Sequence, residues 1–146
     1  MKQSAFSRLI SWLNSTEMFA RPSREIPGIW QLFEYYAEPA GELIHVKENE
    51  LTAGKYFWEI AFDTDGHFRQ KSNLPVQFMP GIDSCKWDRT GNFIILIHPD
   101  NFGKNEKFQF AIERQNLKLL KKNASGRIEI FGFFRKSGES GSSINA

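Results

Sequence analysis

The chain is poor in cysteine, since Cys85 is the only one among 146 residues. A single cysteine excludes an internal disulfide and agrees with a reducing compartment. The first residues lack the uninterrupted apolar core of a secretory signal, because Arg8, Ser11 and Asn14 break it. No cysteine near the start offers a site for a lipid anchor. We therefore expect a cytoplasmic protein.

Long apolar runs, blocks of one charge and common enzyme motifs are also missing. No stretch approaches the roughly 20 apolar residues of a membrane span, so none is expected. The 19 basic residues nearly balance the 17 acidic ones and are interleaved with them, which argues against nucleic-acid binding. Signatures of serine hydrolases, phosphate-binding loops and zinc hydrolases are absent. We assign no catalytic residue, expect no cofactor and disfavour an enzyme.

The residue types that bind metals are scattered. His45, His67 and His98 lie on separate segments without the spacing of metal ligands, so we predict no metal site. Lys86 follows Cys85, but neighbours in a strand point to opposite faces. We therefore expect Cys85 to be an inert, buried thiol.

From residue 28 onward, apolar residues alternate with polar ones. Trp58, Ile60 and Phe62, for example, precede a turn at Asp65-Gly66. About eight such segments follow one another through short turns, which predicts an antiparallel meander. Residues 37–54 are ambiguous and fit a strand edge or a helical turn. A meander of this length avoids a free edge by closing on itself, so we predict an all-β, up-and-down barrel over residues 28–136.

The segments that flank the barrel differ from it. Residues 1–27 read as an amphipathic helix, or two short helical pieces, over 4–19 and a proline linker, and residues 137–146 as a disordered tail. The apolar stripe of the helix consists of Phe6, Leu9, Ile10 and Leu13. So short a helix is not stable alone in water. We expect it to pack against an end of its own barrel, with a second copy in a homodimer as the alternative.

An ordered set of motifs spans the predicted barrel. It comprises Gly28-Ile29-Trp30, Trp58 to Gly66, Cys85-Lys86-Trp87, Phe110-Ala111-Ile112, Leu117-Lys118-Leu119 and Phe133-Phe134-Arg135. This order is similar to that of the small bacterial lipocalin-like domains, which are calycin barrels. The resemblance implies that Gly28 opens the first strand and that Trp30 packs at the closed end of the barrel. It also implies that Arg135 stacks on the indole through a cation–π contact.

Aromatic residues are abundant, with 14 Phe, 4 Trp and 3 Tyr. A barrel of eight strands either holds one small ligand or is filled by its own side chains. The first hypothesis is therefore a barrel that binds a small apolar or amphipathic ligand. The alternative is a protein-interaction domain with a solidly packed barrel. The residues predicted to face a ligand are Tyr36, Tyr56, Trp58, Phe62, Phe68, Trp87, Phe108 and Phe110. Glu34 shares the phase of Trp30 and Tyr36, which places it inside the barrel or at its rim.

Overall fold

The computed structural model describes residues 25–76, 78–79, 83–100 and 102–138. Within them the chain forms nine strands, one short α-helix and one 3-10 turn. The strands are β1 (Gly28–Ala37), β2 (Ile44–Val46), β3 (Trp58–Phe62), β4 (His67–Ser72), β5 (Ser84–Thr90), β6 (Phe93–Ile97), β7 (Glu106–Glu113), β8 (Asn116–Lys122) and β9 (Ile128–Gly138). The helix is α2 (Glu48–Gly54) and the 3-10 turn is η3 (Phe102–Lys104).

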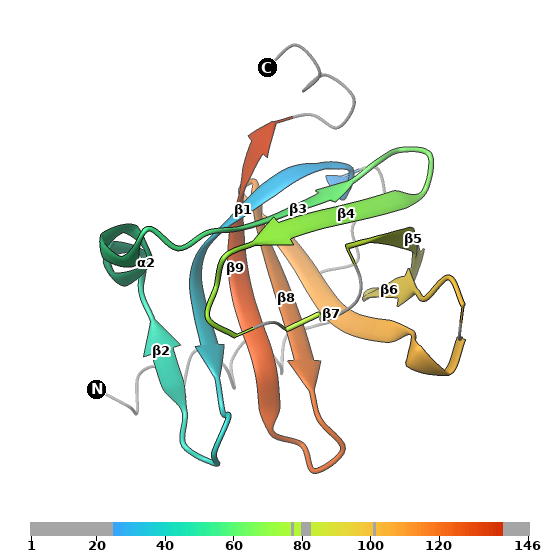
Figure 1. Ribbon diagram of the computed structural model, residues 1–146. Coiled ribbons are helices and arrows are strands. Elements are labelled where there is room, and N and C mark those ends of the chain that lie inside the picture. Colours follow the sequence, from blue (N-terminus) through green and yellow to red (C-terminus); the bar gives the residue numbers. More distant parts are fainter. Residues whose placement is uncertain (1–24, 77, 80–82, 101, 139–146) are drawn as a thin grey trace.

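Eight of these strands close into a ring (Figure 1). Neighbouring strands are antiparallel from β3 to β9, and β1 closes the ring by pairing with both β3 and β9. The ninth strand, β2, lies outside the ring and pairs with the last residues of β1. The predicted all-β, up-and-down barrel of about eight strands is therefore confirmed.

The hairpins follow the turn chemistry of the sequence. Gly66 closes the β3–β4 turn with φ of 93°, a conformation that glycine adopts without strain. Arg114 and Gln115 join β7 to β8, and both have positive φ, at 54° and 65°. Two such residues make a turn whose twist matches that of the strands. Short turns of this kind keep consecutive strands adjacent and close the meander.

Residues 37–54, left open by the sequence, contain both alternatives. Strand β2 comes first and helix α2 follows it. The helix begins after Lys47, whose backbone N–H donates to Glu50 Oε1 at 2.8 Å, and it ends at Lys55 with φ of 56°. Leu51 is its buried residue and joins the core of the barrel.

A β-bulge in β1 changes which residues face inward. Leu32 pairs with Phe134 and Glu34 with Phe133, so one extra residue of β1 lies between them. An extra residue reverses the alternation that follows it. Tyr35 consequently joins the inner core and Tyr36 lies on the outside of the barrel. The prediction that Trp30, Glu34 and Tyr36 share one face is therefore wrong.

Buried apolar residues form two clusters. The first fills the barrel and includes Trp30, Trp58 and Phe110. The second lies on the outside of β1, β7, β8 and β9, where its residues alternate with those of the first. We call this second cluster the outer wall. It consists of Tyr36, Ala111, Leu120, Ile128, Phe131 and Phe133, with Phe33 and Leu43 partly buried beside it.

The strands of the barrel extend from Gly28, where β1 begins, to Gly138, where β9 ends two residues beyond the predicted end. The predicted helix over 4–19 and residues 139–146 lie outside the described residues. Among the residues that are described, no helix is long and apolar enough to cross a membrane.

Candidate functional site

The barrel has two ends that are built differently. We call the end where β1 begins and β9 finishes the closed end. There Trp30 is 1% exposed, and its indole N–H donates to the carbonyl oxygen of Ile26 at 2.9 Å. Lys136 Nζ lies 5.4 Å from the centre of the indole ring. A backbone carbonyl of the segment before β1 and one cation therefore hold this tryptophan in place.

Gly28 is required at the closed end. Its φ is 145°, which other residues rarely adopt. A Cβ there would lie 2.6 Å from Lys136 Cε and 3.1 Å from the carbonyl oxygen of Gly138. Gly28 thus lets β1 and β9 approach closely where the ring closes.

Lys136, rather than Arg135, lies over Trp30, which corrects the prediction from the resemblance. Lys136 is the residue of β9 that pairs with Trp30, and Arg135, one position earlier, faces outward. The Arg135 guanidinium stacks on Phe33 at 4.2 Å, and its Nη1 lies 3.0 Å from Glu48 Oε2. The hydrogen bond from Arg135 and its charge lower the pKa of Glu48.

Most of the predicted aromatic wall lies inside the barrel. Trp87 is partly buried against the inner core, and its indole N–H donates to the carbonyl oxygen of Asp63 at 3.0 Å. The other five are at most 2% exposed: Trp58, Phe62, Phe68, Phe108 and Phe110. A hollow barrel would expose such residues to water-sized molecules from within. Around these five side chains the interior is therefore filled, and their role in ligand binding stays a prediction.

Two predicted residues are not inside. Tyr36 belongs to the outer wall because of the bulge, and its ring stacks on His45 at 4.2 Å. Tyr56 precedes β3 and is 43% exposed, because the chain is still in the connection from α2 at that point. The alternation that begins with Tyr56 in the sequence therefore starts at Trp58 in the structure.

Loop side chains cover the opposite end, where β1 finishes and β3 begins. We call it the mouth. Leu74 and Met79, on the connection from β4 to β5, are buried, and Phe78 is half-buried between them and the core. The Phe78 ring lies 5.4 Å from that of Tyr35 and 5.7 Å from that of Trp58.

A small hollow of about 60 Å³ remains at the mouth. Its lining includes Trp58, Gln70, Leu74, Val76, Phe78 and Met79. Gln70 links Trp58 of the barrel to the loop that covers it. Its Oε1 accepts from the Trp58 indole at 2.8 Å, and its Nε2 donates to the Met79 carbonyl at 3.0 Å. The hollow thus has an apolar side, formed by Trp58 and the loop side chains, and a polar side, to which Lys71, Ser72 and Asp83 contribute together with Gln70.

Tyr35 adds a hydroxyl to the mouth. Burial, and then the nearby Glu50 and Tyr56, raise the pKa of Tyr35. Each of these effects disfavours the charged phenolate, so the Tyr35 hydroxyl remains protonated at neutral pH. It therefore offers a neutral hydrogen-bonding group beside apolar surface.

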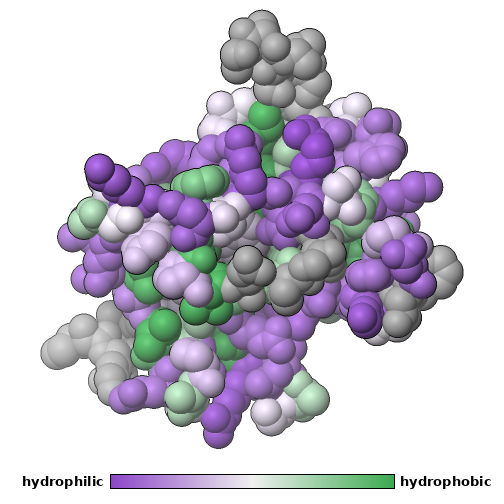
Figure 2. All heavy atoms as spheres, viewed as in Figure 1, coloured by the Kyte–Doolittle hydropathy of each residue, from purple (hydrophilic) through white to green (hydrophobic). Residues whose placement is uncertain are grey.

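The rim of the mouth carries exposed apolar side chains. Four large apolar residues of the described chain are well exposed, and three of them flank the mouth: Tyr56, Phe57 and Val76. Phe57 is tied to the start of the loop by Asn73, whose Oδ1 accepts from the Phe57 backbone N–H at 2.6 Å. The fourth, Ile44, is on β2. Figure 2 shows apolar surface between polar side chains near β2 and below the β3–β4 hairpin.

Sequence reasoning missed most of the mouth. The inward direction of Tyr35 could not be predicted, because it results from the bulge and no residue pattern of β1 indicates a bulge. Phe78 and Leu74 have the alternation of a strand, but Pro75 correctly indicated a loop or an edge there. The approach of this loop to Trp58 is a tertiary contact, so the local sequence holds no signal for it.

His45 contacts a carboxylate, and Cys85 is buried. His45 Nε2 lies 2.5 Å from Glu34 Oε2, so Glu34 is a partly buried residue of the outer surface. In the described part of the chain, no three potential metal ligands come together. Cys85 is buried and Lys86 exposed, and burial raises the pKa of the Cys85 thiol to about 11. This thiol is therefore a weak nucleophile at neutral pH.

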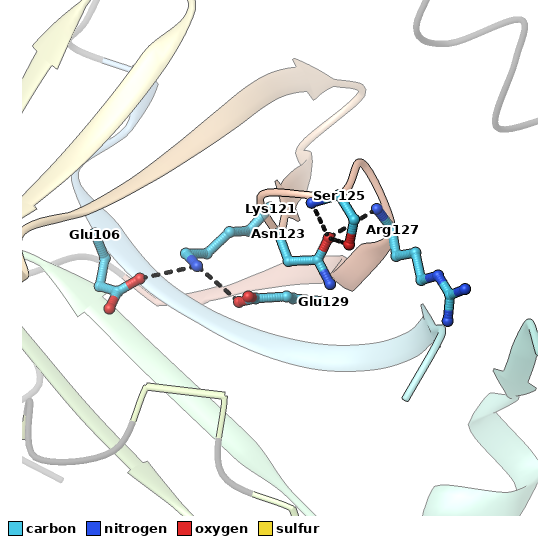
Figure 3. A network of polar contacts seen from close by, with 6 residues as sticks. All are labelled: Glu106, Lys121, Asn123, Ser125, Arg127 and Glu129. Atoms are coloured by element: carbon cyan, nitrogen blue, oxygen red, sulfur yellow. Dashed lines mark hydrogen bonds and ion pairs between the residues drawn. The ribbon is translucent and has the colours of Figure 1, made fainter. Parts of the chain in front are cut away.

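A wider hollow of about 740 Å³ lies on the surface along β6, β7 and β8. Figure 3 shows its polar character: Lys121 Nζ lies 3.3 Å from Glu106 Oε1 and 2.7 Å from Glu129 Oε1. Burial alone would lower the pKa of Lys121, but both carboxylates outweigh it and raise the pKa. Asn123 Oδ1 accepts from Ser125 and Arg127 in the adjoining turn. These groups already bind one another, so we favour the mouth as the candidate site.

Comparisons with known proteins add little to this geometry. No protein-family model and no curated protein match the sequence. Among solved structures, a mutant of the fluorescent protein UnaG is similar at 9% identity and a TM-score of 0.44. The match covers 81% of this chain and all of that one. At this similarity we draw no functional conclusion from it.

Proposed function

We propose that this barrel binds a small amphipathic molecule at its mouth. The observation that carries the proposal is the make-up of the mouth: an aromatic floor at Trp58, a cover of loop side chains and an exposed apolar rim. The Gln70 amide and the Tyr35 hydroxyl, with Lys71, Ser72 and Asp83 on the polar side of the hollow, supply the groups that orient the polar end of an amphipathic ligand.

The ligand has to displace side chains, because about 60 Å³ is far below the volume of a small-molecule site. Such sites usually enclose roughly 300–1,000 Å³. Phe78 and Met79 are the side chains best able to move, since they belong to a connection and not to a strand. Their rotation breaks no ladder hydrogen bond of the barrel. The ligand consequently lies at the mouth, above the filled interior.

A solidly packed interaction domain is the second candidate. It is favoured by the five aromatic residues that are almost fully buried inside the barrel. In that case the apolar rim around Val76 contacts a protein partner, and no small molecule enters.

Titration with the amphipathic dye 1-anilinonaphthalene-8-sulfonate separates the two candidates. We expect saturable binding to the full chain. Val76→Asp should weaken it at least about tenfold, because burying a carboxylate at an apolar site is costly. Thr90→Asp, at the distant β5–β6 turn, is the matched control and should leave binding unchanged.

Absence of saturable binding, or equal effects of the two substitutions, would contradict the ligand proposal and support the solid interaction domain. Native mass spectrometry of the protein purified without denaturation provides a second measurement. A retained small molecule that Val76→Asp removes would identify the natural ligand by its mass.

A further inference from the structure

The outer wall is buried although it lies outside the barrel. Leu120 is 3% exposed, Phe131 2% and Ala111 0%. Antiparallel sheets that face solvent on one side carry polar residues there. The outer wall instead presents contiguous apolar side chains across β1, β7, β8 and β9. Something therefore covers it.

The described neighbours do not account for the cover. Phe33 and Leu43 pack against the wall and are themselves only partly buried. Lys118 and Arg135 lie near its margin, with Lys118 Nζ 5.9 Å from the Phe133 ring and Arg135 over Phe33. A candidate for the cover within the same chain is the apolar segment that precedes Glu25.

We propose that the apolar stripe of residues 4–19 packs across the outer wall. The stripe, formed by Phe6, Leu9, Ile10 and Leu13, is the apolar segment that precedes Glu25. A helix over 4–19 is roughly 24 Å long at 1.5 Å per residue. Four strands spaced about 4.8 Å apart span roughly 14 Å from first to last, so a helix of that length crosses them.

The linker is long enough for this placement. The near edge of the outer wall is Phe33, five residues along β1 from Gly28, and a strand advances about 3.3 Å per residue, or roughly 17 Å. Ile26 is fixed at the closed end by its bond to the Trp30 indole, so the available linker is residues 20–24, which reach up to about 18 Å when extended. The segment can therefore run back along the barrel to the outer wall.

Side chains of the barrel already fill both of its ends, so neither end offers a binding surface for the stripe. The closed end is filled by Ile26, Trp30 and Lys136, and the mouth is covered by Leu74, Phe78 and Met79. The outer wall is the remaining large apolar surface of the described chain. This placement replaces the expectation that the stripe closes an end of the barrel, and it does not depend on the proposed ligand.

Thiol labelling of the full chain tests the inference. Leu120→Cys places a reporter in the outer wall, while the native Cys85 stays unreactive because it is buried with a raised pKa. We expect slow labelling of Leu120→Cys and fast labelling of Thr90→Cys, the exposed control. Adding Leu9→Asp should speed labelling of Leu120→Cys at least about tenfold, because a charge in the stripe opposes burial.

Two further variants keep the test specific. Ser15→Asp adds the same charge on the side of the helix opposite the stripe and should leave the labelling rate unchanged. Leu9→Ala removes apolar surface without adding charge and should speed labelling by a smaller factor, even if Leu9→Asp unfolds the protein. Light scattering should report a monomer throughout.

Three results would overturn the inference. Fast labelling of Leu120→Cys in the parent would show that the wall is open. Slow labelling that neither Leu9 variant accelerates would show that another segment covers it. A dimer whose labelling slows with protein concentration would identify a second copy as the cover.

Discussion

The two ends of the barrel each bury a tryptophan, but different groups hold it in place. Each holds a nearly buried tryptophan, Trp30 at 1% and Trp58 at 2% exposure. Each indole N–H also has one close acceptor, at 2.9 Å and 2.8 Å. For Trp30 that acceptor is a backbone carbonyl, whereas for Trp58 it is the side chain of Gln70.

The difference in partners matters for function. At the closed end Trp30 lies in β1 and pairs with both β3 and β9, so moving it disrupts the sheet. Side chains on a connection can adopt other rotamers at small cost. The comparison therefore predicts a rigid closed end and an adaptable mouth, and each end can be tested separately.

The largest expected effect is the loss of Trp30. Trp30→Ala should lower the free energy of unfolding by about 3–5 kcal/mol, because strands cannot collapse into the space. Trp58→Ala should cost less, about 2–3 kcal/mol, since the loop side chains above it can partly refill the site. Urea denaturation of both variants measures the contrast. Equal losses would show that the mouth is as rigid as the closed end.

Gly28→Ala should also destabilise the closed end. A side chain at φ of 145° is strained, and its Cβ would approach Gly138 O to 3.1 Å. We expect a loss of about 1–3 kcal/mol in the free energy of unfolding. Gly91→Ala, also at positive φ but with open space around it, controls for the backbone strain. The closed-end interpretation fails if Gly91→Ala is the more costly change.

At the mouth, Phe78→Ala should destabilise the protein by about 1–2 kcal/mol, because the ring is only half-buried and lies on a connection. It should enlarge the hollow beside Trp58 and strengthen binding of the amphipathic dye. Denaturation and dye titration are measured on the same variant. A loss as large as that of Trp30→Ala, with unchanged dye binding, would contradict an adaptable mouth.

A smaller effect should distinguish Lys136 from Arg135. In double-mutant cycles with Trp30→Leu, Lys136→Gln should show a coupling of about 0.5–1 kcal/mol. Arg135→Gln should show none, because that side chain faces Phe33 and Glu48. Coupling of Trp30 to Arg135 would instead support the arrangement implied by the lipocalin resemblance.

The smallest effect should appear at high pH. The pKa of Tyr35 is raised above 10.0 in the folded protein, so the folded state retains the phenol proton more tightly than the unfolded state. The resulting stabilisation is complete below pH 10 and is lost as pH rises through the folded pKa. Tyr35→Phe should therefore flatten the decline of stability above pH 10. An unchanged pH profile would mean that water already reaches the hydroxyl at the mouth.

Local patterning predicted the barrel and its interior correctly. Alternation with a period of two identified the strands, and turns such as Asp65-Gly66 fixed their order. The inward direction of Phe62, Phe68, Phe108 and Phe110 followed from the same alternation. These features depend on residues close together in the chain, which is why one sequence sufficed.

Two predictions failed and one contact was not foreseen, in each case where distant segments meet. The bulge in β1 exists because of its pairing with β9, and it moved Tyr36 outside. The register of those two strands placed Lys136 over Trp30 in place of Arg135. The connection after β4 brought Phe78 to Trp58, a contact twenty residues apart in sequence.

The sequence alone therefore determined an all-β, up-and-down barrel with an aromatic interior, because alternation and turn residues act over a few positions. Tertiary structure decided which end is closed, which residues form the mouth and that an outer wall exists. Those features depend on register and on contacts between segments far apart in the chain. A shift of one residue in register moves a side chain to the other face of the sheet, and no local pattern records that shift.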